Sequence, residues 1–126
     1  MTKRRNDYYI LDGQIALPCP DLIEWGRWMQ RADRHVAQTQ IGALWVSTVF
    51  LGLDHGFSTL LGDAGNDDPI LFETMIFNDG EDDYQTRCAT WAEAEDMHAA
   101  AVAIATERVR KADETIQKTT FRGSAV

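Results

Sequence analysis

The fold is decided by Ser47-Thr-Val-Phe-Leu-Gly-Leu-Asp54-His55 and Ile70-Leu-Phe-Glu73-Thr-Met-Ile-Phe77. Both runs are rich in β-branched and aromatic residues, which favour strands. The run from Leu44 to Asp54 is apolar on both alternating faces near its middle, which predicts a central strand. A third strand-like run, Tyr84 to Ala89, follows the turn-rich segment Asn78-Asp-Gly-Glu-Asp-Asp83. Together these three runs predict an antiparallel meander.

Two helices flank this meander in the sequence. Asp21 follows Pro18-Cys-Pro20 and has Glu24 three residues on, a capping-box pattern that predicts a helix ending near Ala32 or Asp33. Thr90-Trp-Ala-Glu93 is a second capping box, followed by a good helix-forming sequence as far as Lys111. The second helix has an inward stripe at three- and four-residue spacing: Ala94, His98, Ala101, Val102, Ala105 and Val109.

The remaining elements are short. Tyr8 to Leu11 predicts a strand closed by the turn signal Asp12-Gly13, and His35 to Gln40 favours an additional early strand. Without that additional strand, the order of elements is β-α-β-β-β-α. With it, one more strand precedes the meander. We therefore expect a two-layer α+β domain, in which two helices pack on one face of a small antiparallel sheet. We expect residues 7–110 to form this domain, 1–6 to be a disordered arm and 111–126 to be frayed helix or disordered.

Composition sets the class of protein. A chain of 126 residues with 44% hydrophobic residues forms one domain with a real core. It has no apolar run long enough to cross a membrane and no apolar stretch of signal-peptide type, so a cytoplasmic protein is the expectation. Cys19 and Cys88 lack metal-site spacing, and we expect both to be reduced thiols.

The net charge of −8 conceals an asymmetry. Residues 7–110 hold six arginines, no lysine and 18 carboxylates, while the other basic residues lie near the two ends. Such an acidic body argues against binding to nucleic-acid backbones, which requires clustered Lys and Arg. It suits either a soluble surface or a protein partner that presents a basic surface.

Four polar residues stand among apolar neighbours: Asp54, His55, Glu73 and His98. The meander predicts that they converge at one end of the domain, provided that the strand register places them on one face. His55, Glu73 and His98 then suit a metal ion such as Zn²⁺, or acid–base chemistry in which Glu73 orients a histidine. In the structural alternative, His98 is a core histidine hydrogen-bonded to Glu73, and Asp54 fixes the loop after its strand.

Other candidate residues concern partners and anions. Trp25 and Trp28 lie three residues apart, which favours either a dimer interface or partial cover of the core. Arg27, Arg31 and Arg87 are candidates for an anionic small molecule, and ion pairing with the surplus carboxylates is the alternative. The acidic run Asp79, Glu81, Asp82 and Asp83 is either a solvated hairpin tip or a docking point for a basic partner.

The chain resembles a family of small uncharacterised proteins encoded by bacteriophages and prophages. The blocks that carry this resemblance are Val46-Ser-Thr-Val-Phe-Leu-Gly-Leu-Asp54-His55, Ile70-Leu-Phe-Glu-Thr-Met-Ile-Phe77 and Ala89-Thr-Trp-Ala-Glu-Ala-Glu-Asp-Met-His98. Similar segments near the start include Tyr8-Tyr-Ile-Leu-Asp-Gly13 and Asp21-Leu-Ile-Glu-Trp25, so that the resemblance covers about residues 8–105. It implies an accessory factor that acts on host machinery, a class that includes inhibitors of bacterial immunity.

Three functions are consistent with these features. The first is a stoichiometric binding protein, a homodimer, that inhibits a host immune protein in the bacterial cytoplasm. The second is sequestration of a small signalling nucleotide by arginines in a dimer cleft. The third is a small metal-dependent enzyme built on His55, Glu73 and His98. No catalytic motif is visible in the sequence, and we expect neither a cofactor nor a membrane partner.

Overall fold

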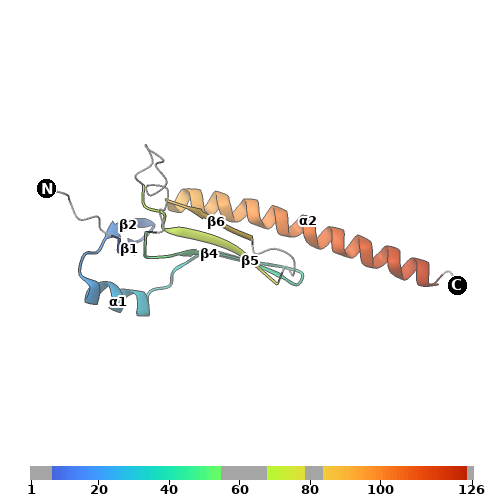
Figure 1. Cartoon of the computed structure of the whole chain (residues 1–126), viewed down its shortest axis with the longest axis horizontal. Helices are drawn as coiled ribbons and strands as arrows, with labels where there is room; N and C mark the ends of the chain where they lie inside the picture. The colour runs from blue at the N-terminus through green and yellow to red at the C-terminus, as the bar shows by residue number, and fades with distance from the viewer. Residues whose placement is uncertain (1–6, 55–67, 79–83, 125–126) are drawn as a thin grey trace.

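A computed structural model describes residues 7–54, 68–78 and 84–124, with side chains as far as residue 117. The elements are β1 (Tyr9–Asp12), β2 (Ile15–Pro18), α1 (Leu22–Arg31), β3 (His35–Ile41), β4 (Leu44–Phe50), β5 (Phe72–Phe77), β6 (Tyr84–Cys88) and α2 (Trp91–Ser124). β1 and β2 form an antiparallel hairpin, and β3 to β6 form a second antiparallel sheet in chain order. Figure 1 shows α2 lying along the larger sheet. The α+β class and the central position of β4 are therefore confirmed.

The larger sheet has one covered face. α2 packs on it through Ala94, His98, Ala101 and Ala105, all of which are buried. Alanines let the helix axis approach the strands closely, and the opposing strands supply the larger side chains Val46, Phe50, Phe72 and Ile76. The inward stripe expected for this helix is thus confirmed. The strand side chains on the face that this stripe covers form the core.

α1 occupies a different place from α2. Figure 1 shows it beyond one end of the larger sheet, and its principal contact is with β1. Only Ala32 to Arg34 separate α1 from β3, so the helix stays beside the point where that strand begins. Trp28 reaches from α1 to the end of β4 and meets the Phe50 ring edge-on, with centroids 5.7 Å apart. The two predicted helices are present, but only α2 covers the face of the sheet.

An aromatic row runs through the core at this end. After Trp28 and Phe50 it continues to Phe72, 5.4 Å from Phe50, and then to Trp91, 6.2 Å from Phe72. Tilted or edge-on ring pairs at these distances add stabilisation beyond the burial of their area. The row links α1, β4, β5 and the start of α2 into one packed unit.

α2 continues past the other end of the sheet. Val109 lies against the β3–β4 turn, where a Cβ on Gly42 would approach Val109 Cγ1 to 3.2 Å. Beyond it, residues 110–117 are exposed, and the helix extends to Ser124 in the segment expected to be frayed or disordered. Arg110 pairs with Glu107 and Glu114, and such i,i+3 and i,i+4 pairs stabilise an exposed stretch of helix. Among the described residues, no helix is long and apolar enough to span a bilayer.

Candidate functional site

Strand register places Glu73 and His98 on opposite faces of the larger sheet. Glu73 lies between Val49 and Arg87 in adjacent strands, whereas its neighbour Thr74 faces α2. The Glu73 carboxylate accepts a hydrogen bond from Arg87 Nε at 2.8 Å and another from the Gln85 amide. This carboxylate therefore belongs to a cross-strand polar group on the face that α2 leaves open.

His98 is a core histidine with hydroxyl partners. Its Nε2 lies 2.9 Å from Thr39 Oγ1, and its Nδ1 lies 2.7 Å from Thr48 Oγ1, which also contacts Thr74 Oγ1. Burial lowers the pKa of His98 below its usual range, because the charged imidazolium loses its hydration there. The structural alternative is correct for the position of His98, but its predicted partner, Glu73, is wrong.

The predicted convergence of polar residues is therefore wrong for the pair Glu73 and His98. Asp54 has the local role expected in the structural alternative, because its Oδ1 accepts a hydrogen bond from Ile70 N at 2.9 Å. This bond joins the two ends of the connection between β4 and β5. His55 lies outside the described residues, and within them no three metal-ligating side chains cluster.

Both helix tryptophans are engaged within the fold. Trp25 Nε1 lies 3.1 Å from the carbonyl oxygens of both Tyr9 and Gly52, and its ring packs 4.9 Å from the Tyr8 ring. Trp28 begins the aromatic row. Both side chains are half-buried, which agrees with the partial-cover alternative, while their predicted role in a dimer interface stays a prediction.

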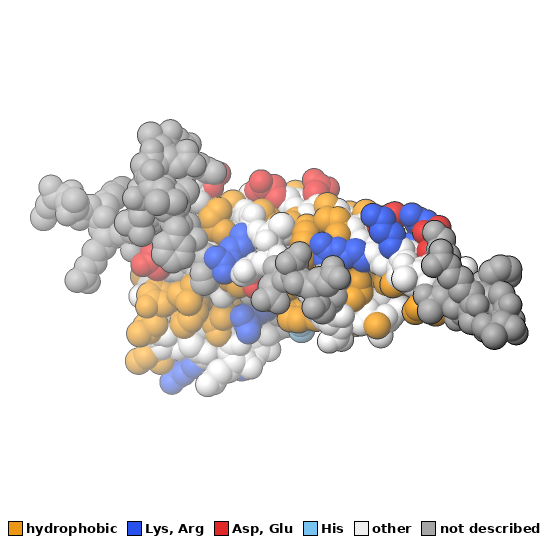
Figure 2. Space-filling view, turned by 45° about the vertical axis from the view of Figure 1, so that its right-hand side comes forward, with side chains coloured by type: hydrophobic (Ala, Val, Ile, Leu, Met, Phe, Trp, Pro, Cys, Tyr) orange, Lys and Arg blue, Asp and Glu red, His pale blue; other side chains and the backbone are white. Residues whose placement is uncertain are grey.

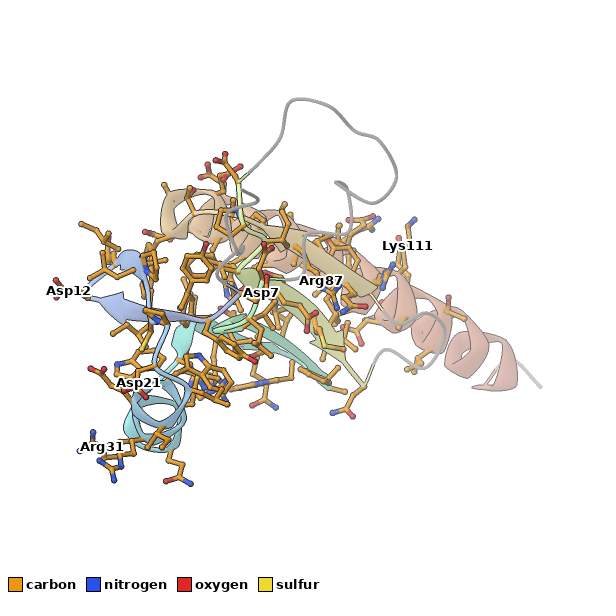
Figure 3. All side chains as sticks on the ribbon, turned by 60° about the vertical axis from the view of Figure 1, so that its left-hand side comes forward. Asp7, Asp12, Asp21, Arg31, Arg87 and Lys111 are labelled. Atoms are coloured by element: carbon orange, nitrogen blue, oxygen red, sulfur yellow. The ribbon has the colours of Figure 1, made fainter. Side chains whose placement is uncertain are left out.

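The three candidate arginines are not brought together. Arg27 and Arg31 are exposed on α1, whereas Arg87 pairs with Glu73 on the open face of the sheet. Figure 3 shows Arg31 and Arg87 well apart. The expected ion pairing is confirmed for Arg87, and within one chain the three arginines do not meet; an anion site in a dimer cleft stays a prediction. Asp79, Glu81, Asp82 and Asp83 lie outside the described residues.

The two cysteines are free thiols with raised pKa values. Desolvation, reinforced by the charge of Glu93, raises the pKa of Cys88 to about 11. Its Sγ contacts the carbonyl oxygen of Thr90 at 3.6 Å. Desolvation also raises the pKa of Cys19. Both thiols are protonated near neutral pH, which is the wrong state for a nucleophile.

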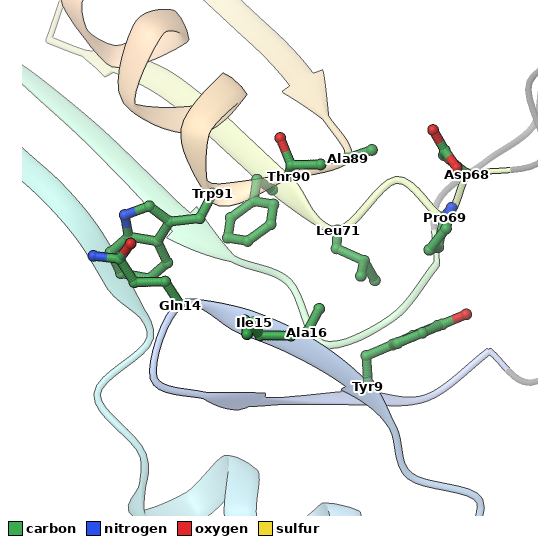
Figure 4. A pocket seen from close by; sticks show the side chains of 11 residues that line it. Tyr9, Gln14, Ile15, Ala16, Asp68, Pro69, Leu71, Ala89, Thr90 and Trp91 are labelled. Atoms are coloured by element: carbon green, nitrogen blue, oxygen red, sulfur yellow. The ribbon is translucent and has the colours of Figure 1, made fainter.

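A cavity opens between the β1–β2 hairpin and the start of α2. This slot has a volume of about 360 Å³, within the range of ligand pockets. Its lining residues are Tyr9, Gln14, Ile15, Ala16, Asp68, Pro69, Leu71, Phe72, Ala89, Thr90 and Trp91. Figure 4 shows hairpin residues on one side, Thr90 and Trp91 on the other, and Leu71 between them. Among the described residues of this lining, Asp68 is the only carboxylate, and none is Lys or Arg.

Four large apolar side chains on β2 and at the start of α1 are exposed, and one of them, Ile15, also lines the slot. Ile15 and Leu17 on β2 are 66% and 39% exposed, and Leu22 and Ile23 at the start of α1 are 56% and 70% exposed. We call these four residues the apolar end. Figure 2 shows hydrophobic side chains gathered on the part of the molecule that carries β1, β2 and α1. Ile15 belongs both to the apolar end and to the slot, so the two form one surface.

Sequence reasoning missed this surface. Ile15-Ala-Leu-Pro18 is a strand of only four residues that ends in proline, and so short a run gives no clear strand pattern in the sequence. Leu22 begins α1 at helical spacing from Trp25 and Met29, yet its side chain is largely exposed because that helix stands at the end of the sheet. The signal that remained was the density of large apolar residues between Ile15 and Ile23, on both sides of the Pro18-Cys-Pro20 break.

No family model, curated protein or solved structure matches the chain.

Proposed function

We propose that this chain is a stoichiometric binding protein and that the apolar end is its docking surface for another protein. The supporting observation is the concentration of exposed large hydrophobic side chains there. Of the six in the described parts of the chain, four lie between Ile15 and Ile23, and the others are Phe77 and Ile116. Isolated exposed apolar residues are ordinary, whereas a contiguous group beside a cavity is typical of an interaction site.

Charge narrows the class of partner. Exposed carboxylates stand close to these elements in the chain: Asp12 ends β1 at the hairpin turn, Asp21 caps α1, and Glu24 lies in its first turn. Arg27 and Arg31 follow further along α1. The chain as a whole has a net charge of −8, which favours a partner whose contact residues are apolar and flanked by Lys or Arg.

The resemblance to bacteriophage proteins suggests where such a partner is found. We propose a protein of the bacterial host as the target, with an inhibited component of an immune system as the most specific form. Covering a basic, nucleic-acid-binding surface would inhibit such a component without any catalysis. In this proposal the protein acts in the cytoplasm of the host cell.

The experiment compares three baits in host lysate at low and moderate salt. These are the wild-type chain, the double variant Leu22→Asp/Ile23→Asp, and Ile116→Asp as a matched control at an exposed apolar residue on α2. A captured protein is then purified, and its affinity and stoichiometry are measured by calorimetry. We expect equimolar binding to the wild type and the control, with a loss of at least about tenfold in the double variant.

Two results would reject the proposal. One is that no protein binds the wild type specifically at low salt. The other is that the double variant, shown by circular dichroism to be folded, binds the purified partner as tightly as the wild type.

A further inference from the structure

The slot has a built aromatic wall. Phe72 is fully buried, and its ring meets the Trp91 ring at an interplanar angle of 85°. Phe72 in turn packs on Phe50, which packs on Trp28. Because the aromatic row continues into the core, these slot residues are held in position before any ligand arrives. A pre-organised site binds without first paying the cost of ordering its side chains.

The opposite side of the slot is apolar and more accessible. Ala16 of the hairpin packs against the same core cluster as Phe72 and Trp91, Ile15 lies at the exposed rim of the slot, and Tyr9 adds a further ring. The volume of about 360 Å³ accommodates one large planar side chain. Aromatic rings are also the groups that prefer edge-on contacts of the kind already made along the row.

The polar groups of the slot favour a cation over an anion. At the start of α2, Glu93 N donates to Thr90 Oγ1 and the Thr90 hydroxyl donates to the Glu93 carboxylate. The Glu93 carboxylate already stands at that helix start and disfavours a second negative charge beside it. Asp68, exposed at one end of the slot, is the charged group among the lining residues that the structure describes.

We propose that the slot receives an aromatic side chain of the partner protein, with a neighbouring Lys or Arg of that partner placed against Asp68. This rests on the proposed function and names the anchor of the same interface. The partner's aromatic ring would pack at the end of the aromatic row. The adjacent Lys or Arg, paired with Asp68, would fix the orientation of that ring in the slot. Anchors of this kind, seated in a pocket and surrounded by weaker contacts, dominate the energy of many interfaces.

Short peptides test the slot without knowledge of the partner. The probes are acetyl-Trp-Arg-amide, acetyl-Trp-Glu-amide and acetyl-Ala-Arg-amide, titrated into ¹⁵N-labelled full-length protein. We expect millimolar binding of acetyl-Trp-Arg-amide, with chemical-shift changes at the amides of Ile15 and Ala16 and at the Trp91 indole. We expect acetyl-Trp-Glu-amide to bind about two- to fivefold more weakly, the size of an exposed charge interaction, and acetyl-Ala-Arg-amide not to bind detectably.

Two variants locate the effect. Asp68→Asn removes the preference for Arg over Glu, whereas Ile15→Ala weakens both tryptophan peptides. Ile116→Ala, at an exposed apolar residue of α2 outside the slot and the apolar end, leaves all three titrations unchanged. Both slot residues are exposed, so the substitutions leave the core intact.

The anchor proposal is overturned if no tryptophan peptide shifts the slot resonances, or if the Arg and Glu peptides bind equally well. That failure is distinct from failure of the proposed function. A partner that still requires Leu22 and Ile23 would then dock on the apolar end without filling the slot.

Discussion

Three threonines on the covered face of the sheet differ in whether their buried hydroxyl groups have hydrogen-bond partners. Thr48, Thr74 and Thr86 occupy one row across β4, β5 and β6, and all turn toward α2. The Thr48 and Thr74 hydroxyls contact each other and join the His98 group. In contrast, the buried Thr86 hydroxyl has no hydrogen-bond partner among the described residues. A buried hydroxyl without a partner costs free energy that a methyl group does not.

Replacing two of these threonines with valine should therefore have opposite effects. Thr86→Val should leave the free energy of unfolding unchanged or raise it by up to about 1 kcal/mol, because it removes an unpaired polar atom. Thr74→Val should lower it by about 1 kcal/mol, because the Thr48 hydroxyl loses one of its two hydrogen-bond partners and keeps only His98. Urea unfolding followed by circular dichroism measures both, and equal losses would show that the Thr86 hydroxyl has a partner.

His98 should make stability depend on pH. Its pKa lies below the ordinary value of 6.5 because of burial, so the unfolded chain binds a proton more readily than the folded one. Stability is then complete above about pH 6.5 and falls as the pH drops toward the lowered pKa of the folded state. Urea midpoints measured from about pH 7.5 down to pH 5 should decline, and His98→Gln should flatten that decline. An unchanged slope in this variant would assign the decline to other groups.

Gly52 is a residue whose backbone and surroundings both exclude a side chain. It has φ +76° and is buried after β4, where an added Cβ would approach Met29 Sδ to 2.6 Å. Gly13 has a similar φ of +62° in the β1–β2 turn, with nothing within 4 Å of an added Cβ. Gly52→Ala should therefore destabilise by more than Gly13→Ala, whose cost is the backbone strain of roughly 1 kcal/mol. Equal losses in thermal unfolding would show that Met29 moves aside freely.

At the scale of elements, helix starts were the most predictable features. Asp21 caps α1 through hydrogen bonds to Ile23 N and Glu24 N, and Thr90 caps α2, both as the sequence indicates. The central β4 was also predictable, because its apolar run identifies a strand buried on both sides. Register was not, since period-two alternation leaves open which neighbour each residue faces. Glu73 consequently lies on the face away from His98.

The α2 cap can be tested directly. Thr90→Ala should lower the free energy of unfolding by about 1 kcal/mol, because the first turn loses its hydroxyl acceptor. Thr90→Ser should retain most of the stability, because serine offers the same oxygen. Chemical unfolding of the two variants separates the cap from the methyl packing of threonine; equal losses would point to the methyl group.

At the scale of the whole molecule, the helix expected on the sheet instead stands at its end. The sequence pattern of α1 identifies a helix with an apolar side, but the pattern does not say what that side meets. Trp25 and Trp28 turn to the hairpin and to Phe50, whereas Leu22 and Ile23 remain exposed. The apolar end therefore results from tertiary placement, and only the arrangement of all the elements reveals it.

The overhang of α2 also fixes how the molecule moves in water. A helix that extends well past the sheet gives the molecule one long axis, which Figure 1 shows lying nearly along the helix itself. Rotation about that axis is faster than end-over-end rotation. The backbone N–H bonds of α2 lie almost parallel to the long axis, whereas those of the sheet lie across it. Their ¹⁵N relaxation rates should therefore differ systematically, so that tumbling anisotropy in solution reports whether the helix stays intact to its final turns.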